Sequence, residues 1–162
     1  MSELTIRPAH MSELSAIGAL TVAAYRADGT VSDSYALRLA DAAARSAEAD
    51  LLVAVDAEDN LLGTVTVVRP GSPWSEISVA GQLEFRMLAV APSARGRGVG
   101  EALVRHVLNQ AAEEGSKAVV LSSSQTMEAA HRLYERMGFQ RTPEVDWSPV
   151  PGLQLITYRL DL

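Results

Sequence analysis

The chain contains no cysteine among its 162 residues. Without thiols there can be no disulfide and no thiolate ligand for a structural zinc ion. A cysteine nucleophile is excluded as well, so no covalent intermediate of this protein can form on a thiol.

Long apolar runs and basic residues are also in short supply. No segment approaches the roughly 20 apolar residues that cross a bilayer, and the first residues lack the basic and apolar pattern of a secretory signal. We therefore expect no membrane partner and a cytoplasmic location. The 14 Lys and Arg against 20 Asp and Glu give a net charge of −6, which disfavours nucleic-acid binding. The three histidines show no metal-ligand spacing, so we expect no metal.

The rest of the composition is that of a soluble globular protein, and the length predicts a single domain over residues 1–162. Hydrophobic periodicity predicts an order of β-α-α-β-β-β-α-β-α-β-β, and hence an α/β sheet with helices on both faces. In chain order, the expected elements are a strand at 4–7, helices at 10–27 and 33–47, strands at 51–56 and 62–69, an irregular loop at 70–81, a strand at 84–90, a helix at 99–115, a strand at 118–121, a helix at 127–137, and strands near 139–145 and 153–160 around a proline-rich turn that contains Trp147.

One segment carries most of the functional signal. An apolar strand ends at Val90, and the sequence Arg95-Gly96-Arg97-Gly98-Val99-Gly100 then leads into an amphipathic helix. The first N–H groups of a helix have no intrahelical acceptor, and the helix dipole favours an anion beside them. Glycines let the backbone approach a diphosphate without a Cβ in the way. The pattern therefore predicts a phosphate-binding turn.

Two common phosphate sites do not fit. The dinucleotide fingerprint G-x-G-x-x-G needs a third glycine where Glu101 stands, and an acidic residue after the next strand, which instead ends in serines. The nucleoside-triphosphate loop needs Gly-Lys-Ser or Gly-Lys-Thr, and neither tripeptide occurs.

The pattern Arg95-x-x-Gly98-x-Gly100 resembles the pyrophosphate loop of the GNAT superfamily of acyl-CoA-dependent N-acyltransferases. The preceding Arg86-Met87-Leu88-Ala89-Val90 resembles that family's fourth strand. About 35 residues further on, the segment 129–139, Ala-Ala-His-Arg-Leu-Tyr-Glu-Arg-Met-Gly-Phe, resembles its last helix and the exit from it. These motifs cover 84–139, while length and element order agree over nearly the whole chain.

The resemblance implies a mixed, mostly antiparallel sheet of about seven strands, splayed at the fourth and fifth strands. It also implies acetyl-CoA as cosubstrate and an N-acetyltransferase activity by direct attack of a primary amine. The implied cofactor-binding residues are Leu88, Ala89, Val90, Arg95, Gly96, Arg97, Gly98, Val99, Gly100 and Met127.

Two residues have implied catalytic roles. Glu84 starts the fourth strand, where family members often place the carboxylate that takes the amine proton; the alternative is a solvated or arginine-paired charge. Tyr134 is expected to protonate the departing thiolate; the alternative is a core tyrosine. Many relatives carry an asparagine seven residues before this tyrosine, where this chain has Met127, so a neighbouring polar residue would have to replace that contact.

The acceptor, a small-molecule or peptide amine, is not identified by the sequence. Acidic and aromatic residues in the three expected acceptor loops favour a cationic amine; they are Asp28, Asp33, Trp74, Glu76, Glu144, Asp146 and Trp147. The alternative role of Trp74 and Trp147 is to anchor their loops. A non-catalytic acyl-CoA-binding or sensor module remains the second interpretation, and a homodimer is an expectation from general frequency alone.

Overall fold

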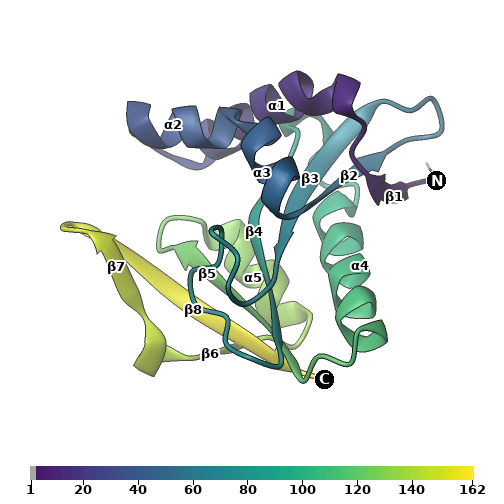
Figure 1. The fold of residues 1–162 in the computed structure, drawn as a ribbon. Helices are drawn as coiled ribbons and strands as arrows, with labels where there is room; N and C mark the ends of the chain where they lie inside the picture. Colours follow the sequence, from purple (N-terminus) through teal and green to yellow (C-terminus); the bar gives the residue numbers. More distant parts are fainter. Residues whose placement is uncertain (1–2) are drawn as a thin grey trace.

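A computed structural model describes residues 3–162, which form one mixed sheet flanked by helices (Figure 1). The elements are β1 (Thr5–Pro8), α1 (Leu14–Asp28), α2 (Asp33–Ala40), α3 (Ala42–Glu48), β2 (Asp50–Val55), β3 (Leu61–Val68), β4 (Gln82–Val90), α4 (Val99–Glu113), β5 (Ala118–Ser124), α5 (Glu128–Arg136), β6 (Gln140–Arg141), β7 (Trp147–Val150) and β8 (Leu153–Asp161). Short 3-10 helices lie at Met11–Glu13, Pro92–Ala94 and Pro143–Val145. Within these residues the sheet has eight strands in the order β1-β2-β3-β4-β5-β8-β6, with β7 paired to β8. The expected mixed, mostly antiparallel architecture is confirmed, with one strand more than expected.

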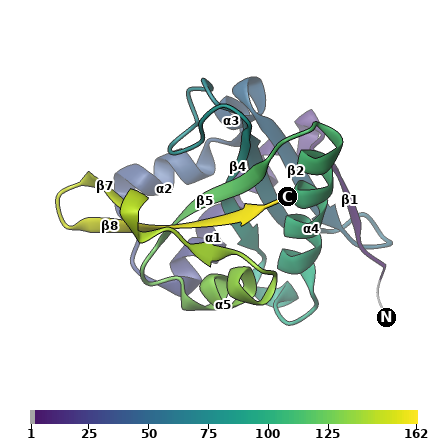
Figure 2. The same cartoon turned by 90° about the horizontal axis from the view of Figure 1, so that it is seen from below.

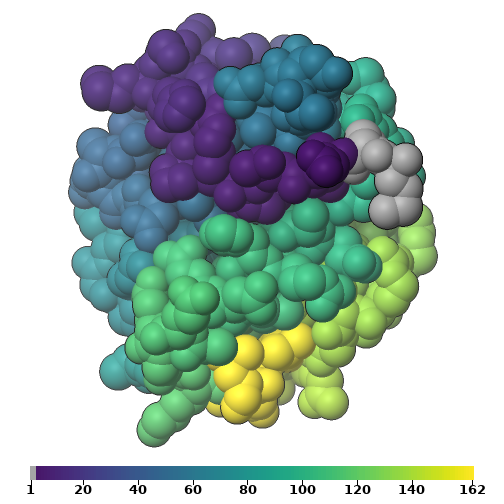
Figure 3. Space-filling view, turned by 90° about the vertical axis from the view of Figure 1, so that its right-hand side faces the viewer, coloured from purple at the N-terminus to yellow at the C-terminus, as the bar shows by residue number. Residues whose placement is uncertain are grey.

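The sheet is covered on both faces, as the continuous apolar runs of its central strands require. On β2, Leu52 and Ala54 belong to the core cluster under α4, while Leu51, Val53 and Val55 pack with α1 and α3. Figure 2 shows α4 and α5 together on one side of the sheet, with α1 to α3 behind it. Figure 3 views the molecule from the α4 side, with the N-terminal segment above and the C-terminal end of β8 below.

The central feature of the sheet is the separation of β4 from β5. These two strands pair in parallel, but only from Gln82 to Glu84 on β4. Beyond Glu84, β4 pairs only with β3, and β5 pairs only with β8 up to Ser124. Two strand edges therefore face each other across an opening, and the expected splay of the fourth and fifth strands is confirmed.

A β-bulge lies on β4 where the two strands have separated. Arg86 pairs with Thr66 and Ala89 with Thr64, so two β4 residues stand opposite one residue of β3. Met87 takes a positive φ of 54° at this point. A bulge re-aims side chains, and here Met87 packs with Leu39 and Trp74 on the α1–α3 face of the sheet. Positive φ is costly for a residue with a side chain and is typical of functional sites.

The N-terminal helices differ from the sequence prediction. The helix expected at 10–27 begins as a 3-10 turn, and α1 proper starts at Leu14. The single helix expected at 33–47 is two helices, α2 and α3, because Asp41 leaves the helical conformation and its side chain caps α3 at Ala44 N–H. Arg45 is fully buried and donates through Nη1 to the carbonyls of Arg38 and Leu39, so it caps the end of α2.

The C-terminal region also differs. The strand expected near 139–145 is reduced to the two residues of β6, because Pro143 starts a 3-10 helix in place of further pairing. Trp147, expected in a turn, opens β7 and donates its indole N–H to Ser122 of β5 at 3.0 Å. The β7–β8 hairpin thereby lies beside the opening between β4 and β5 and contributes to its lining.

Candidate active site

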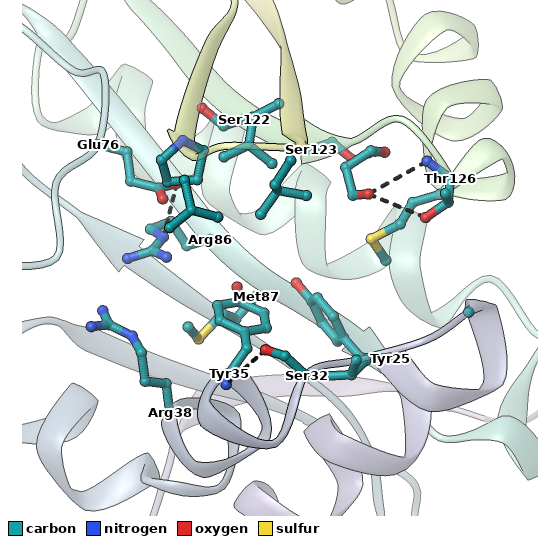
Figure 4. A pocket seen from close by; sticks show the side chains of 18 of the residues that line it. Tyr25, Ser32, Tyr35, Arg38, Glu76, Arg86, Met87, Ser122, Ser123 and Thr126 are labelled. Carbon is teal, nitrogen blue, oxygen red and sulfur yellow. Dashed lines mark hydrogen bonds and ion pairs between the residues drawn. The ribbon is translucent and has the colours of Figure 1, made fainter.

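A cavity of about 820 Å³ lies between the separated strands and the helices above them. Its lining comes from segments far apart in the sequence: α1 and the turn into α2, the loop before β4, the bulge of β4, the end of β5, Tyr134 of α5, and the β7–β8 hairpin. Figure 4 shows two ends of this cavity. Thr126 lies at one end, while Arg38, Glu76 and Arg86 lie at the other.

The glycine-rich turn leads directly into α4. Gly98 occupies the N-cap position with φ +75°, and Gly96 has φ +79°, both in the left-handed region that favours glycine. A Cβ built on either residue would meet no atom within 4 Å, so both glycines face open space. Since α4 begins at Val99, the N–H groups of its first turn lack intrahelical acceptors. The geometry is that of an anion-binding helix start.

The remaining residues of the turn have structural contacts. A Cβ on Gly100 would lie 3.3 Å from Leu133, so this glycine allows α4 to pack closely on α5. Arg95 forms an ion pair with Asp28 at 2.8 Å and also donates to the carbonyl of Ala24. Arg95 therefore ties the turn to the end of α1.

The β4 residues expected along the cofactor lie at the opening. Leu88 lines the cavity, and Ala89 and Val90 follow it on the segment of β4 that pairs with β3 but not with β5. Met127 also lines the cavity, as the N-cap residue of α5. Ser124 and Thr126 line it beside Met127, with their hydroxyl oxygens 3.1 Å apart. These hydroxyls are the polar neighbours available where relatives carry asparagine.

Tyr134 reaches the cavity from α5. Its side chain is buried, with its ring in edge contact with those of Phe85 and Tyr158. Burial raises the pKa of its hydroxyl well above the ordinary value, and Tyr158 adds to the shift. Its hydroxyl forms no hydrogen bond with any other residue of the described part of the chain. The phenol is thus held protonated beside the opening. His131, one turn earlier, is half-buried and bonds Ser123 through Nε2 at 3.0 Å.

Glu84 does not lie where a carboxylate that takes the amine proton is expected to lie. It is fully buried, and it is not part of the cavity lining. Its carboxylate accepts hydrogen bonds from the N–H groups of Glu76, Ile77 and Ser78 at 3.1–3.4 Å, and from the hydroxyl of Ser75 at 3.3 Å. The structure therefore gives Glu84 the task of holding the loop before β4, and does not bring it together with Tyr134.

The loop that Glu84 holds presents a different carboxylate to the cavity. Glu76 lines the cavity and pairs with Nε of Arg86 at 3.1 Å. Burial raises the pKa of the Glu76 carboxyl; Arg86 opposes the shift, and the negative charge of Glu84 adds to it. The sequence assigns Glu76 only to an acidic acceptor loop, because nothing in the local pattern shows that this loop donates hydrogen bonds to Glu84.

Most of the acidic residues expected at the acceptor loops are neutralised within the protein. Asp28 pairs with Arg95, Glu76 with Arg86, and Asp146 with Arg141 at 2.7 Å. The two tryptophans act as anchors: Trp74 is buried beneath Arg38 and Arg86, with ring-centre distances of 5.2 and 5.8 Å, and Trp147 is bonded to β5. The composition that favoured a cationic acceptor is therefore largely accounted for by internal contacts.

Comparison with known proteins agrees with this geometry. Residues 16–139 match the sequence profile of the Acetyltransferase (GNAT) family. The chain belongs to that family. A solved GCN5-related N-acetyltransferase from Kribbella flavida is 27% identical, with a TM-score of 0.73 over 98% of both chains. The putative acetyltransferase yncA of Salmonella typhimurium, solved with its cofactor acetyl-CoA, is 24% identical, with a TM-score of 0.68 over 98% of this chain and 94% of that one.

Curated relatives match over shorter segments. The N-acetylaspartate synthetase of Danio rerio is 38% identical over 71 residues, which are 44% of this chain and 25% of that protein. The chain thus spans about a quarter of the length of that relative. Shared sequence of this extent supports the family.

Within residues 3–162, no three His, Cys, Asp or Glu side chains group in a way that could hold a metal ion. In the same part of the chain, every helix is too short or too polar to cross a bilayer.

Proposed function

We propose that this protein is an N-acetyltransferase that moves an acetyl group from acetyl-CoA to a primary amine of a small molecule or peptide by direct attack. The observation that carries the proposal is the opening between β4 and β5, which Tyr134 lines. The start of α4 lies close to the free end of β4, where a Cβ on Gly100 would be 3.6 Å from Val90. Membership of the GNAT family and the acetyl-CoA in a structure of the same fold support it.

The residues at the opening fit acetyl-CoA. The N–H groups at the start of α4 would hold the diphosphate, with Gly96 and Gly98 leaving room for it. Leu88, Ala89 and Val90 carry backbone groups on the edge of β4 that no β5 residue pairs, and these would bond the pantetheine arm as an added strand would. Ser124 and Thr126 offer hydroxyls beside Met127. Acetyl-CoA supplies the acetyl group as a reactive thioester.

The amine must lose a proton as its nitrogen bonds to the acetyl carbon. We assign that proton to Glu76, because this carboxylate lines the cavity and its raised pKa makes it a stronger base than an ordinary glutamate. Glu84 as the base stays a prediction, and its four hydrogen-bond donors argue against it. In our proposal Glu84 acts indirectly, by holding the loop that carries Glu76.

The sulfur leaves as the carbon–sulfur bond breaks, and Tyr134 donates a proton to it. Burial raises the pKa of this phenol. A thiolate at the same buried place is penalised by the same loss of hydration, so the pKa of the thiol rises together with that of the phenol. The proton transfer therefore stays close to balanced, and the phenol remains protonated until the sulfur needs it.

The test is acceptor-dependent release of CoA. Purified protein is mixed with acetyl-CoA and a panel of amines, and free thiol is followed with a thiol reagent; the chain has no cysteine to give a background. Product mass gives the acetylated amine. Tight acetyl-CoA binding without release by any amine would contradict the proposal and favour the acyl-CoA-binding module.

The choice of base is tested with Glu76→Gln, which should lower kcat by about 100-fold while leaving acetyl-CoA affinity unchanged. Retention of full kcat by this variant would remove Glu76 from the mechanism. A cytoplasmic location and a homodimer stay predictions from the sequence.

A further inference from the structure

The acceptor end of the cavity has an excess of positive charge. Arg38, Arg86 and Glu76 all line it, and they lie together at the end away from Thr126 (Figure 4). Glu76 and Arg86 neutralise each other at 3.1 Å. Asp28, at the other side of the lining, is neutralised by Arg95. One positive charge, that of Arg38, is left over.

Arg86 is committed to the protein itself. Its Nε pairs with Glu76, and its Nη1 donates to the carbonyl of Trp74 at 3.1 Å. The side chain is only 9% exposed. These contacts fix Arg86 as the support of the Glu76 carboxylate.

Arg38 is held differently. Its guanidinium stacks on the ring of Trp74 at 5.2 Å, and no carboxylate of residues 3–162 forms an ion pair with it. An exposed arginine side chain is normally free to move, and stacking on Trp74 restricts this motion. Binding a ligand through the N–H donors of Arg38 therefore costs less conformational entropy. A guanidinium so placed is suited to a carboxylate, which it can bind through two parallel hydrogen bonds.

We propose that the acceptor is a free amino acid, or another amine with a carboxylate close to it, and that Arg38 binds this carboxylate. This inference rests on the proposed function and names its substrate class. The ammonium of such a compound lies only two bonds from the carboxylate carbon. The pairing of Glu76 with the amine and Arg38 with the carboxylate therefore matches the two charges that the cavity presents side by side.

The experiment compares matched acceptors. Standard L-amino acids other than cysteine, whose thiol would react with the reagent, are each assayed beside their carboxamides and their decarboxylated amines. The carboxylate makes the nearby amine more basic, so without recognition the carboxamide would be the faster acceptor at neutral pH. We expect at least one acid to exceed its carboxamide about tenfold in kcat/KM, as a charge-assisted hydrogen bond would provide.

Variants connect the preference to Arg38. Arg38→Gln should reduce the acid-to-carboxamide ratio of kcat/KM about tenfold, mainly through KM for the acid. The matched control is Arg26→Gln, which removes the same charge from an exposed position of α1 outside this cavity and should keep the ratio. A ratio near one for every pair, or an equal loss in both variants, would overturn the proposal.

A binding measurement separates this inference from the proposed function. Thermal stability is measured with CoA and with each N-acetyl amino acid or N-acetyl amino-acid amide. Stabilisation by an acid that Arg38→Gln abolishes, without any turnover, would keep the carboxylate site and reject the transferase. Turnover of amines with no preference for the acid in either assay would keep the transferase and reject the carboxylate site.

Discussion

Replacement of Glu84 by glutamine should destabilise the protein more than it slows the chemistry. The carboxylate is fully buried and accepts from three consecutive N–H groups, those of Glu76, Ile77 and Ser78. Glutamine is close to isosteric, so it removes the charge without opening a cavity. Its amide NH2 group, a donor, would then stand where a carboxylate oxygen accepted hydrogen bonds from the N–H groups of the loop.

The magnitude follows from these contacts. A hydrogen bond to a charged group contributes about 1.5–3 kcal/mol and a neutral one about 0.5–1.5 kcal/mol. Weakening three bonds of 3.1–3.4 Å and setting one donor against another gives a loss of about 3 kcal/mol in the free energy of unfolding. For a chain of 162 residues this corresponds to a fall in Tm of about 6–12 °C.

Urea and thermal unfolding of Glu84→Gln and Glu76→Gln, measured side by side, check the reasoning. Glu76→Gln removes the charge that pairs with Arg86 but keeps an amide oxygen that can accept from it, so Tm should fall by less than in Glu84→Gln. If Glu84→Gln kept the wild-type Tm and lost kcat with a changed pH profile, the carboxylate would be catalytic and the structural account of the loop would be refuted.

Three further outcomes are expected. Tyr134→Phe should lower kcat by about 10- to 100-fold, with acetyl-CoA affinity and Tm nearly unchanged, and undiminished turnover would leave the tyrosine as packing. Gly98→Val should weaken acetyl-CoA binding by more than tenfold in calorimetry, since a β-branched residue at φ +75° is strained by about 1–2 kcal/mol and its side chain enters the space in front of α4; wild-type affinity would remove this turn from the site. The raised pKa of Glu76 means that the folded state holds this proton more tightly than the unfolded state does, so the free energy of unfolding should fall as pH rises from the ordinary value of 4.5 through the raised pKa. Urea unfolding at a series of pH values should show this slope in the wild type and not in Glu76→Gln. An equal slope in both proteins would contradict the assignment.

Predictions that depend on neighbouring residues were more accurate than predictions that depend on contacts between distant parts of the chain. The turn from Arg95 to Gly100 was readable because left-handed glycines and a helix start are properties of adjacent residues. The boundaries of the helices were harder to predict from the sequence. The break at Asp41 depends on a cap that a single side chain makes and on Arg45, which is buried only once α2 and α3 have packed.

The acceptor end could not be read from the sequence. Asp28, Glu76 and Asp146 looked like a negative surface, but each meets an arginine from another part of the chain: Arg95, 67 residues further on, Arg86 or Arg141. The composition gives the number of charged residues but does not show which of them form ion pairs in the folded protein. Only the folded chain leaves Arg38 as the unpaired charge at the cavity among the described residues.

By itself, the sequence determined most of the order of helices and strands, the glycine-rich turn before α4 and the family, because these depend on short-range periodicity and on contiguous motifs. The tertiary structure decided which carboxylate lines the cavity. Glu84 and Glu76 are eight residues apart and chemically alike, and one is buried against loop N–H groups while the other lines the cavity. That difference arises from the path of the loop before β4, which is fixed by long-range packing and hydrogen bonding and has no local signature.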